Sequence, residues 1–170
     1  MHAIIALAAL TLATPAAPPA KQNADLWTQC ENAAGVYDAE PTINACSAII
    51  RSGQESPQNL AAAFSNRGRA EALRGDHARA IQDYDSAIGL NPGFTAAFNN
   101  RGASHLALAD YQHALEDLDQ ALRLAPDNND ALANRGAVLF ALRRFESAIQ
   151  DYSRAIELSP NMADLYLRRS

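Results

Sequence analysis

The chain has 170 residues, enough for one domain with its own hydrophobic core. Its formal net charge is −5, so a basic surface that would bind nucleic acid is not expected. Alanine supplies much of the apolar content and only 6% of the residues are aromatic, which favours closely packed helices over a β-sheet.

The N-terminus predicts export. Residues 3–13 (AIIALAALTLA) form an apolar run, and small residues mixed with proline follow at 14–20. This order resembles a secretory signal peptide, although the preceding stretch carries only His2 where Lys or Arg is usual. The run is shorter than the roughly 18 residues that a membrane-spanning helix needs, so no membrane insertion is predicted. Residues 1–22 are assigned to a signal peptide or disordered leader.

The next segment, 23–56, is predicted to form a degenerate N-terminal helical hairpin. Apolar residues recur there at helical spacing on two stripes, which face each other if the helices are antiparallel: Trp27, Cys30 and Ala34, then Ile43, Cys46 and Ile50. In an exported protein, Cys30 and Cys46 are therefore expected to form a disulfide. The predicted location is therefore the periplasm or the outside of the cell, and the alternative is the cytoplasm. In a cytoplasmic protein the two cysteines would be small buried apolar residues. Residues 52–59 are predicted to be a linker.

From residue 61 onwards the chain repeats every 34 residues. The tripeptide Asn-Arg-Gly recurs at 66–68, 100–102 and 134–136, and proline recurs at 92, 126 and 160. Aligned on these residues, the units are 61–94, 95–128 and 129–162. Each unit contains two apolar-periodic segments separated by a break, which in the first unit are 61–74 and 77–90.

The pattern of the first unit, Phe64, Gly68, Ala80, Tyr84 and Pro92, resembles the tetratricopeptide repeat family, and the resemblance extends over 61–162. It implies an all-α fold, a right-handed α-α superhelix of antiparallel helix pairs. It also implies a non-catalytic scaffold that binds a protein or peptide partner in a concave groove. Residues 163–170 begin a further first helix and are expected to cap the array partially, so their deletion should raise self-association or lower stability.

Two recurrent features are interpreted as packing. A glycine inside a helix costs about 1 kcal/mol relative to alanine, so Gly68, Gly102 and Gly136 predict close approach of the paired helix near Ala80, Ala114 and Ala148. The arginine before each glycine is expected to pair with an aspartate that recurs at the same spacing, within or between units: Asp83, Asp117 and Asp151. As half-exposed pairs, they would contribute about 0–1 kcal/mol each.

The asparagines are predicted to face the groove. Helical geometry places Asn66, Asn100 and Asn134 on the face that lines the groove in this family, one amide per unit. Each amide could hold one peptide group of an extended ligand. This is similar to the asparagine ladder of O-linked N-acetylglucosamine transferase. The further groove residues predicted are Arg69, Asn99, and the apolar anchors Leu106 and Phe140. In the alternative interpretation, the asparagines only bond to neighbouring helices.

The family's carboxylate clamp is not matched, because Ser65 and Arg69 stand where that clamp has Lys and Asn. No nucleophile motif or phosphate-binding loop is present, so neither enzymatic activity nor a cofactor is predicted. His105 is interpreted as a core residue, and a metal site formed with His113 is not favoured. The alternative function is a structural subunit that self-associates through an incompletely capped C-terminal end, as a homo-oligomer.

Overall fold

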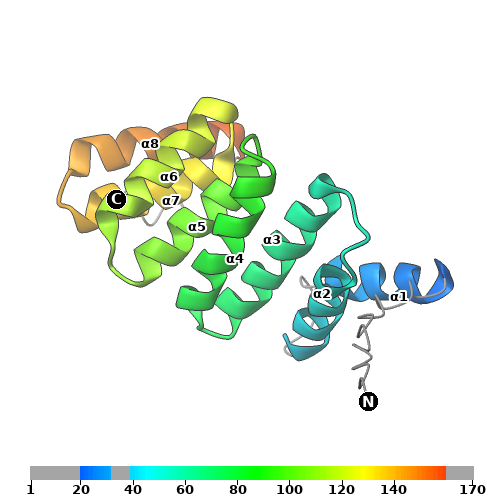
Figure 1. Cartoon of the computed structure of the whole chain (residues 1–170). Coiled ribbons are helices and arrows are strands. Elements are labelled where there is room, and N and C mark those ends of the chain that lie inside the picture. The colour runs from blue at the N-terminus through cyan, green and yellow to red at the C-terminus, as the bar shows by residue number, and fades with distance from the viewer. Residues whose placement is uncertain (1–19, 32–38, 160–170) are drawn as a thin grey trace, which may run out of the picture.

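The computed structural model describes residues 20–31 and 39–159, which contain eight α-helices and no strand. The helices follow one another as antiparallel pairs in a curved row (Figure 1). They are α1 (Ala20–Glu31), α2 (Glu40–Ser52), α3 (Pro57–Leu73), α4 (His77–Leu90), α5 (Thr95–Ala107), α6 (Tyr111–Leu124), α7 (Asn129–Ala141) and α8 (Phe145–Leu158). This is an all-α helical repeat superhelix, as the sequence predicted. Most of the leader, and the segment 163–170, lie outside the described residues.

Local chemistry explains where the helices begin and end. The carboxylate of Asp76 accepts the backbone N–H of Arg79 at 3.1 Å and caps α4, and Asn128 caps α7 in the same way. In the three repeat units the second helices α4, α6 and α8 each end at a leucine, and the next residue is extended because a proline follows it. The linker prediction over 52–59 was too long. Pro57 occupies the first turn of α3 and Ser56 caps it, so only residues 53–56 connect α2 to α3.

The paired helices approach closely at the repeated glycines. A Cβ atom added to Gly68 would lie 2.9 Å from Cε1 of Tyr84 and 3.1 Å from the carbonyl oxygen of Ala80. At Gly102 it would lie 2.8 Å from Cγ of Leu118. The predicted close approach is therefore confirmed, although the nearest side chain lies one turn beyond the predicted alanine. Any larger residue at these positions would push the two helices of the unit apart.

Each repeated arginine connects three helices. In the middle unit, Arg101 of α5 donates to both carboxylate oxygens of Asp117 on α6, at 2.8 and 2.6 Å. Its remaining nitrogen donates to Asp85 on α4, in the preceding unit, at 2.5 Å. Arg135 binds Asp151 and Asp119 in the same way. The arginine therefore bonds both within and between units, because its planar head presents donors in two directions.

The first unit keeps this arrangement with one change. Arg67 of α3 makes the same bidentate contact with Asp83 of α4, and its remaining nitrogen donates to the hydroxyl of Ser47 on α2 at 3.0 Å. The hydrogen bonds from Asp83 raise the pKa of Arg67, against the effect of partial burial. We refer to the three contacts centred on Arg67, Arg101 and Arg135 as the arginine bridges.

These bridges are more buried than the sequence interpretation assumed. The side chains of Asp83, Asp117 and Asp151 are only 9%, 6% and 9% exposed. A carboxylate at this depth depends on its arginine, because an unpaired buried charge costs several kcal/mol. The expected contribution of about 0–1 kcal/mol, which applies to exposed pairs, therefore underestimates what is lost when the contact is broken.

Two substitutions in the middle bridge separate the buried contact from the exposed one. Asp117→Ala leaves Arg101 half-buried without its bidentate partner and should lower the free energy of unfolding by about 2 kcal/mol. Asp85→Ala removes a carboxylate that is 55% exposed and should cost less than about 1 kcal/mol. Urea unfolding followed by circular dichroism measures both. Equal, small losses would show that the buried contact of Arg101 contributes no more to stability than the exposed one.

Candidate peptide-binding groove

The first helices of the pairs form one continuous layer. Backbone contacts join α1 to α3, α3 to α5 and α5 to α7, whereas no contacts of similar extent join successive second helices in the described part of the chain. Clefts of about 230 and 250 Å³ open between α2 and α4 and between α6 and α8, with Arg67 and Arg135 in their walls. Since the second helices are further apart, the row curves with its first helices on the inside.

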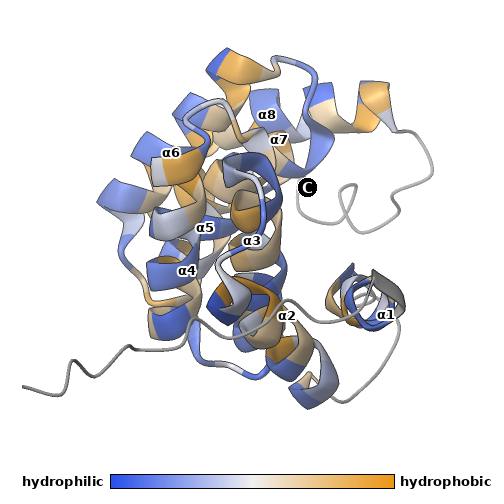
Figure 2. Cartoon of the chain, turned by 45° about the vertical axis from the view of Figure 1, so that its right-hand side comes forward, coloured by the Kyte–Doolittle hydropathy of each residue, from blue (hydrophilic) through white to orange (hydrophobic). Residues whose placement is uncertain are grey.

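Hydrophilic and apolar residues are also distributed differently between the outer and inner sides of the row. Along α4 and α6, hydrophilic residues predominate on the side that faces away from the first helices (Figure 2). The buried side of these helices contributes Tyr84 and Ala87 from α4, and Leu118 and Ala121 from α6. The second helices therefore present a solvated outer surface, and the first helices present the inner one.

The predicted asparagines differ in their hydrogen bonds. Asn100 and Asn134 are half-buried, and both bond to Asn99, which is only 8% exposed. Asn134 Nδ2 donates to Asn99 Oδ1 at 3.0 Å, and Asn99 Nδ2 donates to Asn100 Oδ1 at 3.2 Å. The amides of α5 and α7 are thus connected across the boundary between units. Asn66 is half-buried, and its side chain makes no hydrogen bond to another described residue.

We refer to the connected amides of Asn134, Asn99 and Asn100 as the amide relay. It is relevant to both interpretations of the asparagines. Asn99 bonds between helices and uses its amide for packing, which is the role that the alternative interpretation gives to the whole set. Asn100 and Asn134 each use one side of the amide in the relay and retain further hydrogen-bonding capacity. The predicted ladder of one ligand-binding amide per unit stays a prediction. The structure adds that Asn99 orients two of these amides.

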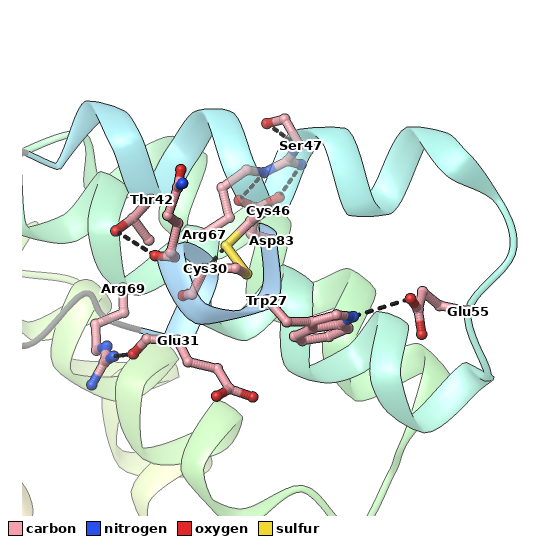
Figure 3. Close-up of a disulfide and its surroundings, with 11 residues drawn as sticks. Trp27, Cys30, Glu31, Thr42, Cys46, Ser47, Glu55, Arg67, Arg69 and Asp83 are labelled. Atoms are coloured by element: carbon pink, nitrogen blue, oxygen red, sulfur yellow. Dashed lines mark hydrogen bonds and ion pairs between the residues drawn. A yellow bond between two sulfur atoms is a disulfide. The ribbon is translucent and has the colours of Figure 1, made fainter. Parts of the chain in front are cut away.

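Arg69 lies at the N-terminal end of the first-helix layer. Its Nη2 donates to the backbone carbonyl of Glu31, the last residue of α1, at 3.4 Å (Figure 3). A cation is favourable at this position because the last carbonyls of a helix carry partial negative charge. The side chain predicted to contact a ligand therefore also attaches α1 to α3.

The two predicted apolar anchors differ in exposure. Leu106 packs against the core formed by α5–α8 and is half-buried. Phe140 is 55% exposed and contacts Phe145 edge-to-face, with ring centroids 5.4 Å apart. Leu142, in the turn after α7, and Ile149, on α8, are also exposed. Of the two anchors, only Phe140 has a largely free surface.

A disulfide joins α1 to α2. The sulfur atoms of Cys30 and Cys46 are bonded, their Cα atoms are 4.9 Å apart, and both residues are fully buried. The surrounding contacts fasten the same hairpin (Figure 3): Trp27 Nε1 donates to Glu55 at 3.0 Å, and Thr42 donates to the carbonyl of Gln29. Hydrogen bonds from Asn59, and then from Trp27, lower the pKa of Glu55.

Sequence reasoning missed several of these residues. Asp85 and Asp119 lie two positions after the predicted aspartates and recur at the same 34-residue spacing, so the spacing could have indicated them. The role of Asn99 as a relay had no such signal, because Ser65 and Ala133 occupy the equivalent positions. Glu55 lies in a loop outside the repeats, where no periodic pattern applies.

This arrangement of stacked helix pairs with an inner layer of first helices defines an α-solenoid. Residues 47–93 and 99–163 match the tetratricopeptide repeat family, and the chain belongs to that family. No curated protein matches the chain. None of the described helices is long and apolar enough to cross a membrane.

Solved structures agree with this assignment. The tetratricopeptide domain of Arabidopsis OM64 is 25% identical, with a TM-score of 0.65 over 66% of this chain and 93% of that domain. The first such domain of Spaghetti (RPAP3), bound to the HSP90 peptide SRMEEVD, is 27% identical, with a TM-score of 0.64 over 66% of this chain and 91% of that one. MamA from Desulfovibrio magneticus RS-1 is 21% identical, with a TM-score of 0.73 over 88% and 80%, and shows the fold alone.

Reduction tests the disulfide without changing any side chain. The cystine closes a short loop, for which chain entropy predicts a contribution of about 3 kcal/mol. Protein recovered from an oxidising compartment should therefore have no reactive thiol, and dithiothreitol should lower the stability of its N-terminal hairpin. Thiol titration under native and denaturing conditions, with urea unfolding before and after reduction, measures both. Two reactive thiols in the unreduced, denatured protein would contradict the account.

Proposed function

We propose that this protein is a non-catalytic interaction scaffold that holds an extended peptide of a protein partner against its first-helix layer. The observation that carries the proposal is the inward-curving layer of α3, α5 and α7, which has half-buried amides at equivalent positions of each helix. Such amides offer a donor and an acceptor to a peptide backbone whatever its side chains. The relative solved with the HSP90 peptide supports a peptide as the class of ligand.

The mode of binding proposed here differs from capture of a terminal carboxylate. Ser65 supplies no charge where the carboxylate clamp has Lys, and Arg69 is engaged with the carbonyl of Glu31. The ligand is therefore expected to bind through internal peptide groups, with Phe140 contacting an apolar side chain. The location that fits best is the periplasm or the outside of the cell, supported by the Cys30–Cys46 disulfide and the leader-like N-terminus.

The proposal is tested with peptides selected from a display library on the full chain. The triple variant Asn66→Ala, Asn100→Ala, Asn134→Ala should bind them more weakly by about 1 kcal/mol per amide. A matched control removes three exposed amides from the second helices, Gln82→Ala, Gln112→Ala and Gln150→Ala, and should leave the affinity unchanged. Amidation of the peptide C-terminus should also have no effect.

Affinities are measured by fluorescence anisotropy on variants whose melting curves match the wild type. Equal affinities in both triple variants would assign the asparagines to the scaffold. If the triple asparagine variant melts early, the single variant Asn66→Ala provides the test, because the Asn66 side chain bonds to no other described residue and its loss should affect binding alone. Unchanged affinity in that variant would contradict the ladder.

A second candidate function is self-association through the C-terminal pair of helices. It is favoured by the exposed apolar residues of this pair, Phe140, Leu142, Phe145 and Ile149. Sedimentation equilibrium of the full chain should then show a dimer or larger species that Phe145→Ser together with Ile149→Ser converts to monomer. A monomeric wild type at high micromolar concentration would exclude this function.

A further inference from the structure

Two imidazoles and a carboxylate converge at the turn between α5 and α6. Nδ1 of His105, at the end of α5, lies 3.3 Å from Oδ2 of Asp110. Nδ1 of His113, in the first turn of α6, lies 2.7 Å from the same oxygen. The two rings stack with centroids 5.2 Å apart, and one ligand atom of each residue lies within 4.8 Å of the others.

We propose that His105, Asp110 and His113 form a binding site for one divalent transition-metal ion, with Zn²⁺ as the ion that suits the donor set best. Zinc binds histidine nitrogen and carboxylate oxygen at about 2.0–2.2 Å in tetrahedral geometry, so neighbouring ligand atoms are about 3.3 Å apart. The 3.3 Å separation of His105 and Asp110 already fits. His113 is 62% exposed and is free to adjust its ring. A water molecule or a partner's side chain completes the coordination.

The buried nitrogen of His105 indicates that the cluster is built for a ligand. Nδ1 of His105 is buried and has no hydrogen-bond partner in the described part of the chain, although it faces Asp110. Buried polar atoms are almost always satisfied, and a metal ion would satisfy this one. Asp110 is held in place as the N-cap of α6, because its Oδ1 accepts the backbone N–H of His113 at 3.4 Å. Its other oxygen faces the two imidazoles.

A second carboxylate lies near the other nitrogen of the His105 ring, beyond hydrogen-bond distance. Nε2 of His105 lies 4.0 Å from Oδ2 of Asp117, whose carboxylate is fixed by Arg101. In metal sites the second ring nitrogen commonly faces a carboxylate, which fixes the tautomer and the orientation of the ring. The arginine bridge of the middle unit would therefore hold a negative charge beside the first ligand of the proposed site.

The cluster is not a consequence of the repeat. The equivalent residues are Glu71, Asp76 and Arg79 in the first unit, and Leu139, Arg144 and Ser147 in the third. In the first unit, Nε of Arg79 lies 3.3 Å from the carboxylate of Asp76, so the chain itself supplies a cation there. In the middle unit both flanking residues are histidines, and the proposed ion takes the place of that cation. Sequence reasoning considered a metal site at His105 and His113 but did not favour it, because the repeat pattern gave Asp110 no place beside them.

The test is zinc titration of the full chain, prepared without a histidine tag and freed of metal with a chelator. Competition with a chromophoric chelator should show one tight site per chain. Asp110→Asn retains the N-cap, because asparagine caps helices as well as aspartate. This variant and His113→Ala should each weaken zinc binding by about tenfold or more. His77→Ala, which removes a histidine from the corresponding turn of the first unit, is the matched control and should bind as the wild type does.

Equal zinc affinity in the wild type, Asp110→Asn and His113→Ala would overturn the proposal. A second measurement does not depend on variants that fold. The wild type loaded with Co²⁺ should develop the intense visible absorption of a four-coordinate site, and addition of one equivalent of Zn²⁺ should abolish it. A spectrum identical to that of aqueous Co²⁺ would also overturn the proposal.

Discussion

The structure depends on one repeated contact, an arginine of a first helix that holds a buried aspartate of its own unit and a polar side chain of the unit before. Helix pairs cannot bury their apolar faces alone and must stack. In this chain the stacking faces are rich in alanine, whose small side chain buries little area. The bridges of Arg101 and Arg135 add directional bonds between units and fix how neighbouring pairs are placed.

The same contact shapes both surfaces that could bind ligands. Because each bridge lies between successive second helices, those helices remain apart while the first helices touch, and the inner layer curves. On that layer the relay through Asn99 orients two amides of the proposed peptide site. On the edge of the middle unit, Asp117 accepts from Arg101 and faces His105 of the proposed metal site. The arginine bridges therefore help to hold the ligand-binding side chains in place before the ligand arrives, which lowers the entropic cost of binding.

The sequence predicted what recurs and failed where the chain departs from its repeat. The 34-residue spacing identified the helix pairs, the close approach at Gly68 and the pairing of Arg67 with Asp83, because each occurs in every unit. It underestimated the burial of the aspartates, because burial depends on how neighbouring units stack. It named Asn99 as a groove residue without indicating that it connects two other amides, and it did not favour a metal site at His105 and His113, because these features occur in one unit only. The disulfide was found outside the repeat because its two cysteines lay on facing apolar stripes.

The central claim is that the arginine bridges couple the stability of neighbouring units and are not merely surface ion pairs. Native-state hydrogen exchange of Arg101→Met tests it most directly, since methionine keeps an unbranched apolar side chain and lacks the charged guanidinium. The account predicts that amides of α4, α5 and α6 all exchange about tenfold faster or more, as expected when a buried carboxylate loses its partner and the coupling is broken. Exchange that changes only within the turn around residue 101, or nowhere, would contradict it.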